Sequence, residues 1–383
     1  MRPIVPTSRL PSVGVSIFTV MSRLAEEHGA INLAQGFPDF DAAPELTALA
    51  GEWFARGCNQ YAPMAGVLRL REELARQIER AYGAPYDPVT EITVTAGATE
   101  ALFSAITALV HPGDEVLLFE PCYDSYVPAV QLAGGAPVFA TLRHPHYAID
   151  WDEVRQLLSP RTRLVVLNTP HNPTGTMWSA DDLRQLASLL DGSGVLVLSD
   201  EVYEHLAFDG RRHASAASVP ALASRTAVVS SFGKSFHTTG WKIGYVSAPA
   251  AITGEIRRVH QFVTFAVNTP LQHAYAEFLA RGVDFEAVRR FYQAKRDRFL
   301  SLTRASRLVP LSCAGTYFML MDYSPIGSDP DQEMAMRLLR EHGVASIPTS
   351  AFMHRSPAPP VLRFCFAKQD ATLERAAERL CAI

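Results

Sequence analysis

The chain has 383 residues, which is enough for two domains or for one large α/β domain with an appendage. Hydrophobic residues make up 48% and charged residues 19%, a balance typical of a soluble globular protein. The net charge of −4 gives no electrostatic reason to expect a nucleic-acid partner, and no apolar stretch approaches the roughly 18 residues that a membrane span needs.

Five cysteines are scattered along the chain, and none of them forms a C-x-x-C pair. Their odd number and irregular spacing favour reduced thiols in a cytoplasmic setting over disulfides or a zinc site, so we expect no metal. Residues 1–6 contain neither an apolar core nor a small-residue cleavage site, and we therefore expect no secretory leader.

Helix and turn signals dominate the first part of the chain. Apolar residues between 13 and 24 recur at helical spacing, which predicts an amphipathic helix behind an N-terminal arm. A short strand then runs into a turn at Gly36, where the missing side chain lets backbone approach a ligand closely. A second helix is expected within 44–57, and a loop that carries Tyr61 precedes a third helix.

From residue 91 the pattern changes to strand, turn and helix. Residues 92–95 are β-branched, residues 96–99 form a small-residue turn, and residues 100–110 are helical in pattern. The unpaired N–H groups and the dipole of such a helix start point at one spot and favour an anion. The signal is weak by itself and gains value only if another part of the chain requires a phosphate.

Strands then alternate with helices or loops. The strand-like runs are expected at 115–119, 137–141, 163–168, 194–199, 226–230 and 243–246. Together with residues 92–95, these runs make seven strands. Their near-continuous Val, Leu and Ile predict an α/β fold with a mostly parallel seven-stranded sheet, covered by helices on both faces. Ligands of such sheets gather at the carboxyl ends of the strands.

Helical segments follow, at 251–262, 268–281 and 285–306, and then a smaller β/α unit with strands near 316–321 and 361–366. We interpret residues 38–270 as a large, cofactor-binding domain. Residues 1–37 and 271–383 would form a small α/β domain that includes the N-terminal arm.

One lysine stands out at the end of the predicted strand 226–230. Lys234 lies in a glycine-marked bend among apolar rings, and Lys242 follows eight residues later. A lone lysine is usually a solvated surface charge. Desolvation and a second cation would instead lower its pKa, as an amine needs if it is to attack an aldehyde or ketone and form a Schiff base.

An aldehyde cofactor with a ring nitrogen and a phosphate, which is pyridoxal phosphate, would need further partners. Asp200, at a strand end, could keep the ring nitrogen protonated, and Tyr203 could lie by the ring hydroxyl. Tyr123 could stack on the ring. The phosphate would be held by N–H groups, hydroxyls and a cation, for which the candidates are Ala98, Thr99, Ser231 and Lys242.

A substrate carboxylate would need a clamp. Arg363 lies inside the apolar strand 361–366, where a charge is costly unless it is paired. It is therefore either part of a structural ion pair or held for a ligand, and we favour the ligand. Asn172 is its natural companion.

Four motifs together resemble the class I, fold-type I, pyridoxal phosphate-dependent aminotransferases. They are AGATE at 96–100, NTPHNPTG at 168–175, SDEVY at 199–203 and SFGK at 231–234, and their order spans nearly the whole chain. QGFPDF at 35–40 and TTGWKIG at 238–244 are similar to the branch of methionine aminotransferases and kynurenine/glutamine aminotransferases.

The resemblance assigns roles by position. It makes Lys234 the Schiff-base lysine and proton carrier, Asp200 the partner of the ring nitrogen, and Tyr203 that of the ring hydroxyl. The implied cofactor-binding residues are Gly97, Ala98, Thr99, Tyr123, Asn172, Asp200, Tyr203, Ser231, Lys234 and Lys242, joined in a homodimer by Tyr61 of the partner subunit. The implied substrate-binding residues are Gly36, Asn172 and Arg363, with Phe18, Phe37 and Phe352 as aromatic pocket residues.

Two features bear on specificity. Position 242 is a lysine, where the best-known aspartate aminotransferases have an arginine. The lysine keeps the positive charge but lacks the bidentate hydrogen-bonding geometry of a guanidinium. No obvious second arginine is present for a side-chain carboxylate. The resemblance therefore implies transfer of the amino group of an apolar, thioether or aromatic L-amino acid, methionine-like as the best guess, to a 2-oxo acid by a ping-pong mechanism.

Three alternatives are weighed. A C–S β-lyase of the same fold would use the same lysine to eliminate a thiol from a cysteine conjugate. Ser231 and Lys234 fit the S-x-x-K motif of penicillin-recognising hydrolases, but the S-D-N and K-T-G partner motifs are missing. A regulatory module of the same fold would need a DNA-binding domain, and there is no basic patch for one.

Overall fold

A computed structural model describes residues 6–355 and 357–383 of the chain, so part of the predicted N-terminal arm lies outside the described residues. Its main sheet has seven strands in the order β2-β8-β7-β6-β5-β3-β4. Their bounds are β2 Ile92–Thr95, β3 Glu115–Glu120, β4 Ala136–Thr141, β5 Thr162–Asn168, β6 Leu196–Asp200, β7 Thr226–Ser231 and β8 Gly244–Ser247. β8 runs antiparallel to both of its neighbours, and the other pairings are parallel. The predicted, mostly parallel sheet is confirmed.

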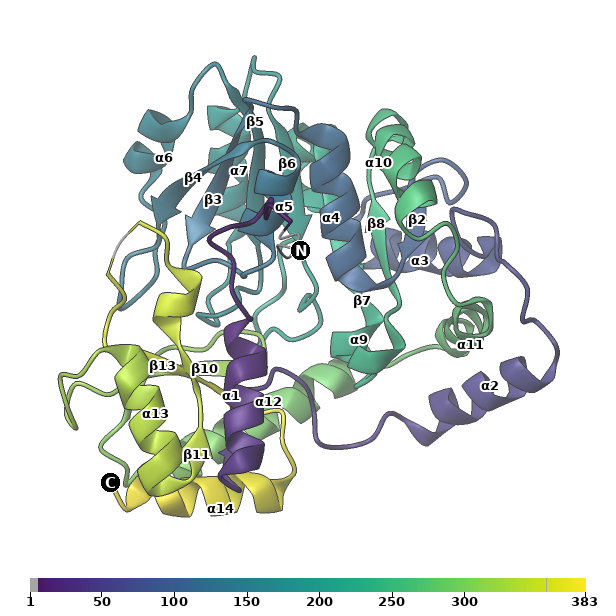
Figure 1. Cartoon of the computed structure of the whole chain (residues 1–383). Coiled ribbons are helices and arrows are strands. Elements are labelled where there is room, and N and C mark those ends of the chain that lie inside the picture. The colour runs from purple at the N-terminus through teal and green to yellow at the C-terminus, as the bar shows by residue number, and fades with distance from the viewer. Residues whose placement is uncertain (1–5, 356) are drawn as a thin grey trace, which may run out of the picture.

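Alternate residues of each strand enter two different cores. Val116 and Leu118 of β3 face one core, and Leu117 and Phe119 face the other, as the two-residue period of a strand requires. On the first side lie α4 Gly97–Leu109, α5 Tyr126–Leu132 and α10 Ala250–Val263. On the second lie α2 Pro44–Ala55, α3 Leu68–Tyr82, α6 Trp151–Leu157, α7 Ala180–Leu189, α8 Pro220–Ala223 and α11 Thr269–Ala280. Both faces of the sheet are therefore covered (Figure 1).

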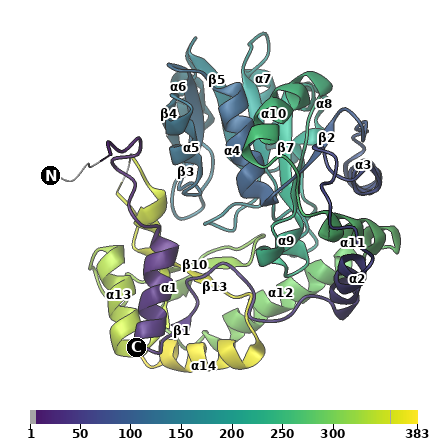
Figure 2. The same ribbon diagram turned by 45° about the vertical axis from the view of Figure 1, so that its right-hand side comes forward.

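A third core is built around a four-stranded sheet in the order β12-β13-β10-β9. Its strands are β9 Val309–Pro310, β10 Phe318–Asp322, β12 Ile347–Pro348 and β13 Val361–Cys365, and β1 Ile31–Asn32 pairs with β11 Val344–Ala345 beside it. The helices here are α1 Ile17–Glu27, α12 Phe285–Leu302, α13 Asp331–His342 and α14 Asp370–Cys381. The purple α1 lies beside the yellow C-terminal elements in both views, so both ends of the chain build this core (Figures 1 and 2).

The N-terminal helix begins later than its apolar spacing suggests. The pattern started at Val13, but α1 starts at Ile17 because the Ser16 hydroxyl accepts the N–H of Thr19 and caps the helix there. Val13 is left half exposed. At the other end of the chain, α12 stops at Leu302, earlier than the predicted 306.

Among the described residues there is no helix that combines the length and the apolar character needed to cross a membrane. In the same part of the chain, no group of three or more His, Cys, Asp or Glu side chains is arranged to hold a metal ion. The five cysteines are free thiols.

Candidate active site

A cavity of about 310 Å³ opens where the carboxyl ends of β6 and β7 meet the start of α4 and the strand β13. Such strand ends are where α/β sheets bind ligands. Most of the predicted site residues line this cavity, namely Phe18, Gly36, Phe37, Gly97, Ala98, Thr99, Tyr123, Asn172, Asp200, Tyr203, Ser231, Lys234, Lys242 and Arg363. Segments more than 300 residues apart in the sequence thus meet at one place.

Lys234 lies in the four-residue helix α9 Phe232–Ser235, directly after β7. Ser231 caps this short helix by accepting the N–H of Gly233 at 3.3 Å. The lysine Nζ is 5.7 Å from the ring centre of Tyr203 and 5.6 Å from that of Tyr317. Burial and the charge of Lys242 lower the pKa of Lys234 to about 8, so a substantial fraction of the amine is neutral near physiological pH.

Asp200 closes β6 and is only 3% exposed. The Tyr126 hydroxyl donates to its carboxylate at 2.6 Å, and the Val202 N–H donates at 3.4 Å. Burial raises the pKa of Asp200 to about 6 against these hydrogen bonds, which leaves it ionised at neutral pH. A buried carboxylate with one tyrosine and one N–H as partners is suited to bind a cationic ring nitrogen.

The corner between α4 and β8 is suited to an anion. α4 begins at Gly97 with a φ of 74°, a conformation that favours glycine, and a Cβ added there would lie 3.1 Å from Lys242 Nζ. The N–H groups of Ala98 and Thr99 are in the first turn, which has no carbonyl partners within the helix. Ser231 lines the same cavity. A helix start, a lysine and a hydroxyl together provide the donor set that a phosphate needs.

Arg363 is 1% exposed in the middle of β13. It donates to Asn172 Oδ1 at 2.7 Å and to the Ala34 carbonyl at 3.1 Å, and neither partner is a carboxylate. Its Nε finds no hydrogen-bond partner in the described part of the chain. The guanidinium lies 3.8 Å from the ring centre of Phe318 and 5.0 Å from that of Phe18. A buried cation with a free donor calls for an anionic ligand.

Two predicted residues lie outside the cavity lining. Tyr61 is 81% exposed, and its ring stands edge-on to Phe265 at 5.3 Å. Phe352 is fully buried, 6.0 Å from the ring of Phe18 and 5.4 Å from the Arg363 guanidinium. Phe352 therefore supports the wall of the cavity from behind.

The structure adds residues that the sequence did not assign. Asn168 donates to the Asp200 carbonyl and accepts the N–H of Asn172, both at 2.8 Å, so it joins two strand ends. Tyr126 binds Asp200 across 74 residues of sequence, and the Tyr317 hydroxyl donates to the Gly36 carbonyl at 2.6 Å. Asn168 stands in a recognised motif and could have been assigned, whereas the two tyrosines carry no local signal.

The cofactor deduced from the sequence fits this set of groups. A half-buried amine faces the position that an aldehyde would take, and a buried carboxylate faces the position of a ring nitrogen. The start of α4, together with Lys242, faces the position of a phosphate. The φ of 74° at Gly97 favours glycine in this corner, and an added Cβ would crowd the end of the Lys242 side chain.

Comparison with known proteins gives consistent matches over nearly the whole chain. Residues 28–380 match the family model described as aminotransferase class I and II. The chain is 52% identical over 380 residues to the methionine aminotransferase of Escherichia coli (strain K12), covering 99% of this chain and 98% of that one. It superposes on a crystal structure of YbdL from Escherichia coli, whose description identifies a methionine aminotransferase function, with a TM-score of 0.97 and 51% identity over 100% of both chains.

More distant relatives differ in the substrates that their names state. The chain is 40% identical over 388 residues to the probable N-succinyldiaminopimelate aminotransferase DapC of Mycobacterium tuberculosis, covering 98% of both. It is 35% identical over 415 residues to the kynurenine–oxoglutarate transaminase of Dictyostelium discoideum, covering 98% of this chain and 95% of that one.

Proposed function

Because the chain belongs to the family of class I and II aminotransferases, which use pyridoxal phosphate, we propose that it transfers the amino group of an apolar, thioether or aromatic L-amino acid to a 2-oxo acid. Methionine is the first candidate donor. The observation that carries this choice is the cavity wall. Arg363 is the only arginine among its described lining residues, and Phe18, Phe37 and Phe318 stand around the remaining space. An aromatic wall with one arginine favours a substrate with a single carboxylate.

Lys234 is the proposed proton carrier. Bound pyridoxal phosphate supplies an electron sink for the negative charge that develops at the substrate Cα. The neutral Lys234 amine takes the Cα proton and later returns it on the cofactor side, and its lowered pKa makes this base available near neutral pH. Asp200 holds the ring nitrogen in its protonated form, and Tyr203 binds the ring hydroxyl.

The other residues bind and orient. Ala98, Thr99, Ser231 and Lys242 hold the phosphate, Gly97 lets the backbone approach it, and Tyr123 stacks on the ring. Arg363, Asn172 and Gly36 hold the α-carboxylate, and the unpaired Nε of Arg363 supports this role. Orientation of this kind converts binding energy into correct placement of the Cα–H bond above Lys234.

A homodimer completes the proposal. Tyr61, Phe262 and Phe265 are 81%, 87% and 51% exposed, a large apolar surface for a monomer and one that a second copy would cover. Tyr61 of the partner subunit then reaches the phosphate. We further propose a division into residues 38–270 and residues 1–37 with 271–383, and a cytoplasmic setting, which the free thiols support.

Donor specificity tests the proposal. The purified enzyme with pyridoxal phosphate should form the 2-oxo acid of methionine in the presence of a 2-oxo acid acceptor, with higher kcat/KM for methionine and phenylalanine than for aspartate. A preference for aspartate would overturn the substrate class. Release of ammonia and a thiol from a cysteine conjugate, without transamination of methionine, would identify a β-lyase instead.

A further inference from the structure

A buried histidine–glutamate pair lies just behind the phosphate corner. His260 of α10 is fully buried between α4 and the loop that carries Tyr61. Its Nδ1 lies 3.0 Å from Glu100 Oε1, and its Nε2 lies 3.0 Å from the Met64 carbonyl oxygen. Both ring nitrogens therefore face acceptors.

These contacts define the charge on both groups. A carbonyl oxygen can only accept, so Nε2 must carry a hydrogen. Glu100 also accepts the N–H of Ala96 at 3.1 Å and the Ser104 hydroxyl at 2.6 Å, contacts that suit a carboxylate. Nδ1 must then carry a hydrogen too, and His260 is an imidazolium.

The electrostatics agree with the hydrogen bonds. Burial disfavours the charged ring, but the hydrogen bond and charge of Glu100 outweigh it and raise the pKa of His260 above its ordinary 6.5. The charged groups that act on the ring are Glu100 of α4 and Arg257 of α10, and Arg257 opposes the charge. Arg257 is itself held by the Thr93 hydroxyl of β2.

The pair joins the two segments that the proposed phosphate site requires. Through Glu100 it holds the N–H of Ala96, the residue immediately before the turn at Gly97. Through Met64 it holds the loop of Tyr61, and the same loop is tied to β2 by the Val94 N–H on the Ala65 carbonyl. The protonated His260 ring thus connects the phosphate-binding turn with the Tyr61 loop, which in the proposed dimer reaches the partner subunit.

We propose that His260 is a positioning residue for the cofactor phosphate: as an imidazolium paired with Glu100, it holds the phosphate-binding turn and the Tyr61 loop in register. This inference depends on the phosphate site of the proposed function. His260 does not line the cavity, so it acts through these segments and not by contact.

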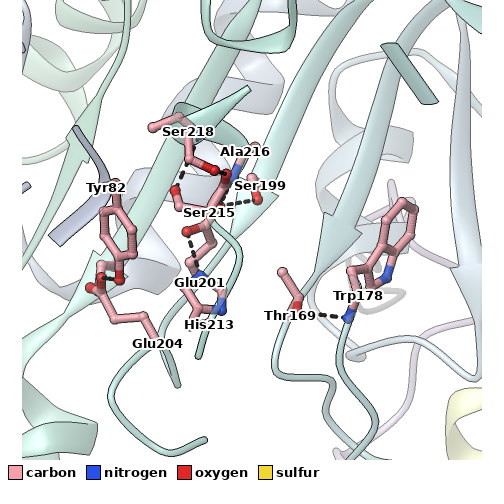
Figure 3. A network of polar contacts seen from close by, with 12 residues as sticks. Tyr82, Thr169, Trp178, Ser199, Glu201, Glu204, His213, Ser215, Ala216 and Ser218 are labelled. Carbon is pink, nitrogen blue, oxygen red and sulfur yellow. Dashed lines mark hydrogen bonds and ion pairs between the residues drawn. The ribbon is translucent and has the colours of Figure 1, made fainter. Parts of the chain in front are cut away.

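A matched control exists elsewhere in the chain. His213 Nε2 lies 2.7 Å from Glu201 Oε2, and Figure 3 shows this pair with the ring turned toward the carboxylate. The His213 side chain is 3% exposed, but its Nδ1 has no hydrogen-bond partner among the described residues. One hydrogen on the ring satisfies this pair, and it has no contact with the phosphate corner.

Nitrogen NMR tests the protonation directly. In protein labelled with [15N]histidine, both ring nitrogens of His260 should resonate as protonated nitrogens at pH 7, and the signals should be identified by their loss in His260→Gln. A neutral His260 ring would overturn the inference. The charge is read in the wild type, and the variant serves only to assign the two signals; His260→Asn provides the same assignment if His260→Gln folds poorly.

Cofactor affinity tests the positioning role. The apo protein, prepared from the holoenzyme, should be titrated with pyridoxal phosphate and with pyridoxal, which lacks the phosphate. His260→Gln should lower the affinity ratio of the two about tenfold, the ratio that corresponds to about 1.4 kcal/mol. Glu100→Gln should act in the same direction. His213→Gln should leave the ratio unchanged, because any effect on binding of the pyridine ring is common to both compounds and cancels.

The pH dependence of this affinity ratio distinguishes a role of the charge on His260 from a simple loss of packing. In the wild type the affinity ratio should fall as pH rises through the raised pKa of His260, and in His260→Gln that fall should be absent. An unchanged ratio in both His260→Gln and Glu100→Gln would overturn the inference. The expected ratios in a protein that does not transaminate methionine would support the inference and overturn the proposed function alone.

Discussion

Lys234 must meet two requirements that oppose each other. It has to be buried so that water does not compete for its chemistry, and it has to be available as a neutral amine. The structure satisfies both by removing the ammonium from water and placing it near Lys242, and these two effects outweigh the attraction of the Tyr203 and Tyr317 rings for a cation. The lowered pKa that results is useful for catalysis but costs stability in the cofactor-free protein.

Replacing Lys234 should therefore separate activity from stability. Lys234→Met should reduce transamination about 10⁴-fold or more, because the proposed base and covalent anchor are lost. The pKa of Lys234 is about 8 in the folded protein against 10.5 for an ordinary lysine. The charged lysine therefore lowers the free energy of unfolding by its full amount below pH 8, and this destabilisation disappears above pH 10.5. The apo variant should be more stable than the wild type by about 3 kcal/mol at pH 7, with no difference above pH 10.5. Denaturant unfolding of both apo proteins across this range checks it.

The charge of Lys242 can be tested apart from its role at the phosphate. Capture of pyridoxal by the apo enzyme, followed by absorbance, should rise with pH around 8 as Lys234 loses its proton. In Lys242→Gln this midpoint should move to higher pH, because a nearby positive charge that lowers the pKa of Lys234 is removed. Pyridoxal has no phosphate, so loss of the anion site does not interfere. An unmoved midpoint would contradict a contribution of Lys242 to the lowered pKa.

At the scale of elements, β8 brings the phosphate corner together. It runs antiparallel between β2 and β7 and presses Gly244 against the start of α4. A Cβ at Gly244 would lie 2.7 Å from the Gly97 carbonyl carbon, 2.8 Å from the Ala98 nitrogen and 2.9 Å from the Ser230 carbonyl oxygen. All three are backbone atoms of packed elements, so none can move aside at low cost.

Gly244→Ala should destabilise the protein by about 1–3 kcal/mol and weaken pyridoxal phosphate binding, because the start of α4 must shift. Gly240→Ala is the matched control, four residues earlier in the same segment, with nothing within 4 Å of an added Cβ. Its effect should stay within about 0.5 kcal/mol. Thermal unfolding and cofactor titration of both variants make the comparison. Equal effects of the two substitutions would contradict the contact argument.

The sequence predicts elements and motif residues well because both leave local signals. Runs of Val, Leu and Ile mark the parallel strands, and Asp200 and Lys234 stand directly at strand ends. The antiparallel direction of β8 and the Tyr126–Asp200 hydrogen bond leave no such signal, since both follow from how distant segments meet. His260 carries no local signal either, because its partners Glu100 and Met64 are 160 and 196 residues away.

At the scale of the whole molecule, the candidate site lies between the seven-stranded sheet and the four-stranded sheet. Asp200 and Lys234 follow strands of the large sheet, and Arg363, the proposed carboxylate clamp, comes from β13 of the four-stranded sheet. The hydrogen bond from Arg363 to Asn172 is the bridge between them. A bound α-carboxylate would join the same bridge, so substrate binding should tie the two halves together.

Removal of the Arg363–Asn172 hydrogen bond should therefore weaken the use of substrate more than the binding of cofactor. Arg363→Met should lower kcat/KM for methionine about 10²-fold, equivalent to about 3 kcal/mol for a lost charged hydrogen bond. Affinity for pyridoxal phosphate should change little, because the residue faces the proposed carboxylate position. Steady-state kinetics and cofactor titration provide the two numbers. A loss of cofactor affinity as large as the loss of kcat/KM would place Arg363 in the cofactor site instead.

The proposed dimer makes a prediction that a monomeric enzyme cannot meet. Tyr61→Phe and Tyr61→Ala should weaken phosphate binding, although Tyr61 lies outside the cavity of its own subunit and is 81% exposed. In a hybrid of one Tyr61→Ala subunit and one Lys234→Ala subunit, the site that keeps Lys234 would receive an intact Tyr61 of the partner subunit. That site is native, and the other carries both defects.

Mixing the two inactive or impaired proteins under conditions of subunit exchange should therefore restore activity, up to one native site in each hybrid dimer. If Tyr61 served its own subunit, the hybrid would contain no native site, and mixing would add nothing to the activity of the separate variants. The measurement is the transamination rate against mixing ratio, with Lys234→Ala mixed with Arg363→Met as control. Both of those changes lie in the lining of one cavity, so that pair should restore nothing.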